Sequence, residues 1–371
     1  MAVSVVGFAG AVAWGTLSSR GARPTDGRSP FQVPVPQTVR AEPRFFADLF
    51  GYGGEGTVEI RKSSSGRFVA LLGAGPQPGL LRGGEVSAVT AVGARSLLIA
   101  VQRACSAQFA RVQVTSQGDI GSVSPAGSAL TGLVTSVAAS ANGQIVAYTL
   151  ITPCAKGGHG YIGVLNLSDG QRRQWPQVSI EGVSLGRLGL QGPLSLSANG
   201  RLIGFAATAN SSPFGDMTGE QVRILPTDSA PGSVASRSRV VLRPKALEAV
   251  ALSPSGRSYY LCTAQAASAR SATALIAAYA VGADKPYSVL ATVTGPTNDL
   301  SGAGCRGMAL DPSGGTLLVP YTDLARQVNT ARGNTLVRIA VINTATRARS
   351  DIAIQYPRGA MTPGNLIGAT W

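Results

Sequence analysis

The fold of this 371-residue chain is decided by one stretch, Ala249-Val250-Ala251-Leu252-Ser253-Pro254-Ser255-Gly256-Arg257-Ser258-Tyr259-Tyr260-Leu261. It predicts two short apolar strands joined by a tight turn. Proline inside the turn sets φ near the required value, and serine side chains can bond the backbone there. Glycine at the corner accepts a positive φ without a steric penalty. The stretch therefore predicts a β-hairpin.

The same hairpin recurs along the chain. Its copies surround Ser140-Ala141-Asn142-Gly143, Ser197-Ala198-Asn199-Gly200 and Asp311-Pro312-Ser313-Gly314, with a degenerate copy at Val92-Gly93-Ala94-Arg95. Turn positions 94, 143, 200, 256 and 314 are 49, 57, 56 and 58 residues apart. Self-similarity at such a period is typical of propeller blades or of another repeat array.

A weaker kind of hairpin lies between these copies. It shows partial alternation of apolar and polar residues, which half-buried strands require. One repeat therefore contains four strands, A to D, which is the content of one propeller blade. The predicted C-D hairpins are Phe109–Val123, Tyr161–Gln177, Gln221–Leu242, Ala274–Val293 and Thr335–Ile354.

The two ends of the chain predict how the ring closes. Thr57–Leu72 has its turn glycine, Gly66, only 28 residues before position 94, so it is interpreted as a C-D hairpin. Arg44–Phe50 then supplies strand B, and Asn365–Trp371 supplies the missing strand A. Five whole blades and one blade made from both termini give six, with no free sheet edge.

A strand, a Ser/Asp-Pro-x-Gly turn and a second strand, repeated four to five times, resemble the six-bladed TolB-like and WD40-like β-propellers of bacteria. The similarity covers roughly residues 43–371. It implies an all-β, six-bladed propeller and leaves the role open, because propellers host unrelated functions.

Composition and the N-terminal sequence predict the domain organisation. The share of hydrophobic residues is 44%, which is ample for the core of one large domain at residues 43–371. Residues 1–19 contain an uncharged run, Ala2–Ser19, that predicts a membrane anchor. A cleaved signal or an ordinary buried segment is the alternative, and the basic residues after the run oppose export by the positive-inside rule. Residues 20–42, rich in Pro, Gly and Arg, are interpreted as a linker.

The four cysteines form two pairs, each in adjacent repeats. Cys105 and Cys154 each lie 11 residues past their turn position, whereas Cys262 lies six residues past Gly256 and Cys305 nine residues before Gly314. We expect two disulfides, Cys105–Cys154 and Cys262–Cys305, each worth on the order of 3–4 kcal/mol in the chain-entropy model. Four unpaired buried thiols are the alternative. Disulfides are typical of an oxidising compartment, so the localisation expected is extracytoplasmic, either membrane-anchored or secreted.

The motifs with a possible chemical role are weak. Gly182-Val183-Ser184-Leu185-Gly186 matches the GxSxG of hydrolases, and Gly51–Gly56 matches GxGxxG, but no strand–turn–helix context surrounds either. Carboxylates are scattered, with Asp216 and Glu220 in one loop. We therefore expect no catalytic residue, no cofactor and no metal ligand.

The net charge of +14 comes almost entirely from arginine. It predicts either a generally basic surface or contact with anionic polymers or lipid headgroups. No basic-aromatic pattern of a nucleic-acid module is visible, so we expect no nucleic-acid partner, and a monomer.

Long B-C and D-A loops are expected to crowd one face of the disc, where binding residues collect. These loops are Thr152–Gly160, Ala207–Glu220, Thr263–Ala272 and Thr322–Asn334. Trp371, Phe205 and Tyr260 are assigned to the core. The predicted ligand- or partner-binding residues are Arg103, Lys156, His159, Asp323, Arg326 and Arg332.

The leading hypothesis is a non-enzymatic, exported and membrane-tethered propeller that binds a protein or an anionic envelope polymer. The alternative is a propeller hydrolase or lyase with a site at the channel mouth, which would need a metal or paired acids there. An intracellular scaffold with reduced cysteines is the third hypothesis.

Overall fold

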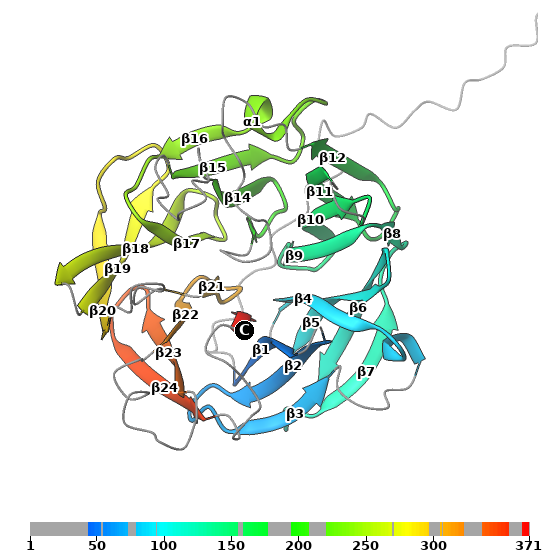
Figure 1. Ribbon diagram of the computed structural model, residues 1–371, viewed down its shortest axis with the longest axis horizontal. Helices are drawn as coiled ribbons and strands as arrows, with labels where there is room; N and C mark the ends of the chain where they lie inside the picture. Colours follow the sequence, from blue (N-terminus) through cyan, green and yellow to red (C-terminus); the bar gives the residue numbers. More distant parts are fainter. Residues whose placement is uncertain are drawn as a thin grey trace, which may run out of the picture.

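The structure is a computed structural model of the chain. It describes residues 44–52, 55–72, 79–93, 95–154, 159–176, 194–207, 220–268, 271–296, 305, 307–322, 336–355 and 366–370. Six antiparallel sheets stand in a ring around a central axis (Figure 1). The predicted all-β, six-bladed propeller is confirmed. We number the blades 1 to 5 in chain order and call the sixth the closing blade.

Each blade has four strands, ordered from the axis outward as A, B, C and D. Blade 1 contains β4 (Glu85–Ala91), β5 (Ser96–Arg103), β6 (Ser106–Val114) and β7 (Ile120–Pro125). Blade 2 contains β9 (Leu133–Ala139), β10 (Ile145–Thr152), β11 (His159–Asn166) and β12 (Arg172–Pro176). Blade 3 contains β13 (Ser195–Leu196), β14 (Leu202–Ala207), β15 (Gln221–Pro226) and β16 (Arg239–Leu242).

The remaining blades follow the same order. Blade 4 contains β17 (Leu247–Leu252), β18 (Ser258–Ser268), β19 (Ser271–Ala280) and β20 (Ser288–Pro296). Blade 5 contains β21 (Ala309–Leu310), β22 (Thr316–Thr322), β23 (Leu336–Asn343) and β24 (Arg349–Gln355). Three short elements lie outside this pattern: η1 (Gly79–Leu81), β8 (Leu130–Thr131), which pairs with β6, and α1 (Val234–Arg237).

The closing blade joins the two ends of the described chain. Its strands are β25 (Leu366–Thr370), β1 (Phe45–Tyr52), β2 (Glu55–Lys62) and β3 (Phe68–Leu72). β25, the red strand at the centre of Figure 1, pairs antiparallel with β1, with Ala47 opposite Thr370 and Leu49 opposite Gly368. The predicted closure by a C-terminal strand A is confirmed, although Trp371 itself lies outside the described residues.

The repeated turns form as the sequence predicts. Gly143, Gly200, Gly256 and Gly314 all have positive φ. The first turn residue bonds the strand that follows: the Ser140 hydroxyl accepts from the Ile145 N–H at 3.0 Å, and Asp311 Oδ1 accepts from the Gly315 N–H at 2.8 Å. Because these polar atoms satisfy the turn backbone, the sequence signature repeats wherever the turn does.

Backbone hydrogen bonds link the A-B turns of neighbouring blades. The Ala141 N–H donates to the Ala198 carbonyl at 3.0 Å, and the Ala198 N–H donates to the Pro254 carbonyl at 2.8 Å. The turns of blades 2, 3 and 4 are therefore joined around the axis. We call the face that carries the A-B and C-D turns the turn face, and the opposite one the loop face.

The hydrophobic core is divided among the contacts between blades. Six clusters of buried side chains occur among the described residues, and each combines residues of two adjacent blades. Phe205 (2% exposed) and Tyr260 (7% exposed) belong to these clusters, as predicted. Since each blade is covered on both sides by its neighbours, no blade has a complete core by itself.

The two predicted disulfides are confirmed. Cys105 is bonded to Cys154 and joins blades 1 and 2, while Cys262 is bonded to Cys305 and joins blades 4 and 5. Each disulfide joins two blades that also share an apolar cluster at their interface.

One loop prediction is wrong. Thr263–Ala272 does not form a long open loop, because β18 and β19 continue as a hairpin that remains paired out to Ser268 and Ser271. The segments predicted as anchor and linker, residues 1–42, lie outside the described residues. No helix in the described part of the chain has the length and apolar character needed to cross a membrane.

Deleting Leu366–Trp371 tests the closure. It removes strand A of the closing blade and leaves the inner edge of β1 unpaired beside buried Ala47 and Leu49. Each buried backbone group without a partner costs roughly 1–3 kcal/mol, so we expect a loss on the order of 5 kcal/mol. Thermal unfolding measures it, with a chain lacking residues 1–42 as the matched control expected to melt like the full protein. An unchanged melting temperature after the C-terminal deletion contradicts this closure.

Replacing one cysteine pair by alanine tests the disulfides. The bonds close loops with sequence separations of 49 and 43. The chain-entropy model gives about 4 kcal/mol for loops of this length, so we expect each double variant, Cys105→Ala with Cys154→Ala or Cys262→Ala with Cys305→Ala, to lose stability of that order. Equilibrium denaturation measures the loss. Denaturation midpoints that do not differ from the wild type would mean that the blades hold together without these bonds.

Candidate functional site

Only part of the predicted site lies in the described residues. Arg103 ends β5 and is exposed, and its guanidinium donates to the Arg82 carbonyl at 3.1 Å. His159 begins β11 and is also exposed. Both residues lie at the loop-face ends of their strands in adjacent blades, and their role in binding stays a prediction. Lys156, Asp323, Arg326 and Arg332 lie outside the described residues, so the convergence of the six remains a prediction.

The turn-face end of the central channel holds a small cavity lined mainly by apolar residues, among them alanines, leucines, prolines and a methionine. The cavity there has a volume of about 110 Å³, with Ala139, Ala141 and Ala198 in its wall. Asp311 is the one carboxylate among the described lining residues, and it is buried. Its oxygens accept from the Ser313 hydroxyl and the Gly315 N–H, so it serves its own turn.

A much larger hollow lies at the rim of the turn face. We call it the rim groove; it has a volume of about 1100 Å³. Its walls come from three blades: the β2–β3 turn of the closing blade, the β6–β7 turn of blade 1 and the β23–β24 turn of blade 5. The charged and aromatic side chains in its described lining are Arg44, Phe45, Lys62, Arg67, Phe68, Asp119 and Arg349.

The rim groove is basic. Arg44 and Arg67 are exposed and Lys62 is half-buried, and none of these three side chains has an ion-pair partner among the described residues. Arg349 is different, because Asp351 neutralises it through two hydrogen bonds of 2.9 Å. Asp119 is the only carboxylate in the described lining. An anion entering the groove would therefore meet three cations and one carboxylate.

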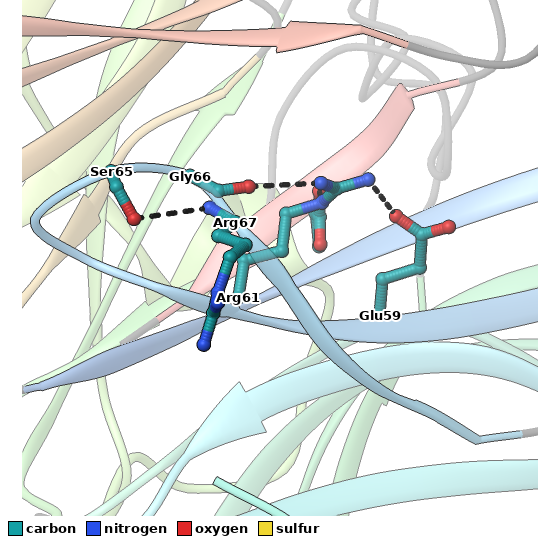
Figure 2. Close-up of polar contacts among 6 residues, drawn as sticks. Glu59, Arg61, Ser65, Gly66 and Arg67 are labelled. Atoms are coloured by element: carbon teal, nitrogen blue, oxygen red, sulfur yellow. Dashed lines mark hydrogen bonds and ion pairs between the residues drawn. The ribbon is translucent and has the colours of Figure 1, made fainter.

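A buried ion network holds the wall formed by the closing blade. Arg61 on β2 is 6% exposed, and its Nε donates to Asp48 Oδ2 on β1 at 3.1 Å. Its other nitrogens donate to Glu59 and, at 2.9 Å, to the Gly66 carbonyl (Figure 2). One guanidinium therefore ties strands B and C to the β2–β3 turn. The backbone that carries Arg67 and Phe68 is fixed as a result.

The same turn packs closely on blade 5. A Cβ atom placed on Gly66 would come within 2.3 Å of Ile352 Cγ2 on β24, and Gly66 has a φ of +67°. Only glycine fits both the contact and the conformation. Phe68, one residue past Arg67, is 48% exposed and lies with its ring 6.0 Å from the Arg61 guanidinium carbon.

The GxGxxG match lies between two strands and not before a helix. Its first two residues end β1, and its last two begin β2. A Cβ on its last glycine, Gly56, would overlap the Val86 carbonyl oxygen at 1.7 Å, so this glycine allows the closing blade to approach blade 1. The GxSxG match lies outside the described residues, as does Asp216.

One buried carboxylate, Glu220, and one half-buried carboxylate, Glu248, have structural partners. Glu220 is 3% exposed and accepts from the Leu247 N–H of the next blade; burial raises the pKa of this carboxyl, and the N–H partly offsets the rise. Glu248 accepts from the Cys305 N–H at 2.7 Å and lies near both sulfurs of the Cys262–Cys305 disulfide. Because those sulfurs are bonded to each other, they offer no thiolate to a metal ion.

The rim groove is not evident from the sequence. Long loops favour a site on the loop face, whereas the groove is built from short turns of three blades. One signal was present: Arg44, Lys62 and Arg67 cluster around the turn at Ser63-Ser64-Ser65-Gly66. Only the pairing of β25 with β1 brings that turn beside blade 5.

Comparisons with known proteins agree with the fold. No protein-family model matches the chain, and no curated protein matches it. Among solved structures, TolB from Acinetobacter baumannii is similar, with 11% identity, a TM-score of 0.50, and coverage of 88% of this chain and 66% of the TolB chain.

Two further propellers are less similar. Sqt1 from Chaetomium thermophilum was solved with the N-terminus of ribosomal protein L10. It has 14% identity and a TM-score of 0.39, and the match covers 86% of this chain and 72% of the Sqt1 chain. An oligogalacturonate lyase solved with manganese has 10% identity and a TM-score of 0.44, and the match covers 81% of this chain and 72% of the lyase chain. The similarity to TolB supports the propeller fold, and none of these similarities carries a function to this chain.

Glu220→Gln tests the buried carboxylate. Burial raises the folded-state pKa of Glu220, so the protonated side chain is favoured in the folded protein. The stability that Glu220 contributes is therefore fully present below about pH 4 and is lost as the pH rises through the raised pKa. We therefore expect the melting temperature of the variant, relative to wild type, to increase between about pH 4 and pH 7. Glu85→Gln, at an exposed position on β4, controls for the loss of one negative charge. A difference that does not change with pH contradicts the raised pKa.

Proposed function

We propose that this chain is a non-enzymatic binding module, exported and tethered to the membrane by its N-terminal segment, whose propeller binds a protein or an anionic envelope polymer. The basic rim groove carries the proposal. It is a hollow of about 1100 Å³, and three of its cations, Arg44, Lys62 and Arg67, have no ion-pair partner in the described part of the chain. It also stands on rigid blade ends, as binding sites commonly do.

The two disulfides support the extracytoplasmic part of the proposal. They join blades 1 and 2 and blades 4 and 5, and the chain has four cysteines, all of them paired. Bonds of this kind form and persist in oxidising compartments, while cytosolic thiols are kept reduced.

The competing function is a hydrolase or lyase with its site at the channel mouth. At the turn-face end, the cavity of about 110 Å³ is lined mainly by apolar residues, and Asp311 is occupied by its own turn. That end supports a binding role, since acid–base chemistry needs groups that can reach a substrate.

A capture experiment separates the two functions. Full-length protein in detergent, immobilised on a matrix, is mixed with a solubilised envelope fraction, and eluted material is compared by mass spectrometry with the input. We expect reversible retention of an envelope component whose covalent structure is unchanged. Conversion of a component to products without a stable complex would establish the enzyme instead. Acid-quenched alkylation of protein taken directly from cells tests the compartment, and four alkylated cysteines would contradict export.

A further inference from the structure

We propose that the rim groove is a binding site for an acidic polysaccharide, whose anionic groups contact Arg44, Lys62 and Arg67 while one sugar ring stacks on Phe68. The inference deepens the proposed function and rests on it. The four residues belong to one corner of the closing blade: Arg44 precedes β1, Lys62 ends β2, Arg67 lies in the turn and Phe68 begins β3.

The charges select an anion with several spaced negative groups. Two guanidinium groups can each bind a carboxylate or phosphate in a bidentate way, and the lysine adds a point charge. Since Asp351 already neutralises Arg349, blade 5 adds little positive charge to the site. The excess of cations is therefore concentrated on the closing blade, along one wall of a groove open to solvent.

Phe68 supplies an aromatic surface at the same place. It is 48% exposed, although exposed phenylalanine is costly in water, and it adjoins Arg67. The Arg61 guanidinium lies near its ring at 6.0 Å, and Arg61 is itself held by Asp48 and the Gly66 carbonyl. A ring supported in this way is an ordered platform that loses little freedom when a flat apolar face, such as that of a sugar ring, packs on it.

A hydroxyl group in the lining also lacks a partner. The Oγ atom of Ser63 is buried and accepts or donates no hydrogen bond among the described residues. Buried polar atoms are nearly always bonded, so this oxygen is suited to bind a ligand hydroxyl. Polysaccharides carry many such groups, whereas an acidic peptide offers fewer.

Other occupants fit the groove less well. Residues 1–43 join the described chain at Arg44, but that segment carries four arginines, Arg20, Arg23, Arg28 and Arg40, against one aspartate and one glutamate. Its charge has the same sign as the groove. A flat bilayer surface cannot enter a hollow of about 1100 Å³ between three turns, while a flexible polymer can.

Binding is measured by isothermal titration calorimetry on the full-length protein in detergent. The probes are oligogalacturonate (carboxylate groups), a sugar-substituted poly(glycerol phosphate) (phosphodiester groups), neutral dextran and poly-glutamate. We expect at least one acidic glycan to bind about tenfold or more tightly than dextran and poly-glutamate, with an affinity that falls as salt rises. The tighter of the two acidic glycans identifies the anionic group preferred.

Two variants locate the site. The triple variant Arg44→Gln, Lys62→Gln, Arg67→Gln is expected to lose about tenfold or more in affinity for the glycan, because charge-assisted hydrogen bonds are removed. Phe68→Ala is expected to lose about tenfold for the glycan through the lost stacking, and to leave the weak binding of poly-glutamate unchanged. All four side chains lie at the protein surface, and melting temperatures verify that the variants fold.

The matched control is Arg172→Gln, Arg201→Gln, Arg257→Gln, which removes the same charge from exposed positions outside the groove. It is expected to bind like wild type. Poly-glutamate binding as tightly as the glycans overturns the inference in favour of an acidic protein partner. Equal losses in the groove and control variants overturn it in favour of a general basic surface. Envelope capture that survives the groove variants leaves the proposed function standing and refutes this site.

Discussion

The pairing of β25 with β1 is the interaction on which the rest of the structure depends. Each blade buries its two faces only against its neighbours, so the six apolar clusters exist only while the ring is closed. Two of those clusters involve the closing blade, which has no inner strand without the last described residues of the chain. Hydrogen bonds between the two ends of the chain therefore hold together a core that is spread around the axis.

The remaining connections reinforce the same ring. Backbone bonds link the A-B turns on one face, and disulfides join two pairs of blades on the opposite side. Apolar burial supplies most of the attraction between blades, while these local links fix how neighbouring blades are set against each other. A rigid disc results, and its turns keep fixed positions although most of them contain only a few residues.

The rim groove is a consequence of ring closure. Its main wall carries residues from the start of the propeller, and the wall opposite carries residues from blade 5, near the end of the chain. The buried Arg61 network and the close contact of Gly66 with Ile352 hold the first wall in place. The basic residues of the closing blade are thus presented on a fixed surface, which lowers the entropic cost of binding an extended ligand.

Sequence alone determined the blade count, the order of strands, the closure and both disulfides, because turns of the Ser-x-x-Gly kind depend on local chemistry that repeats with each blade. It also identified core residues such as Phe205 and Tyr260. It did not reveal the rim groove, since Arg44, Arg67 and the β23–β24 turn are adjacent only after the ring has closed. Nor did it reveal that Arg349 is neutralised while Arg67 has no ion-pair partner among the described residues, because such pairing is decided by side-chain distances in the folded chain.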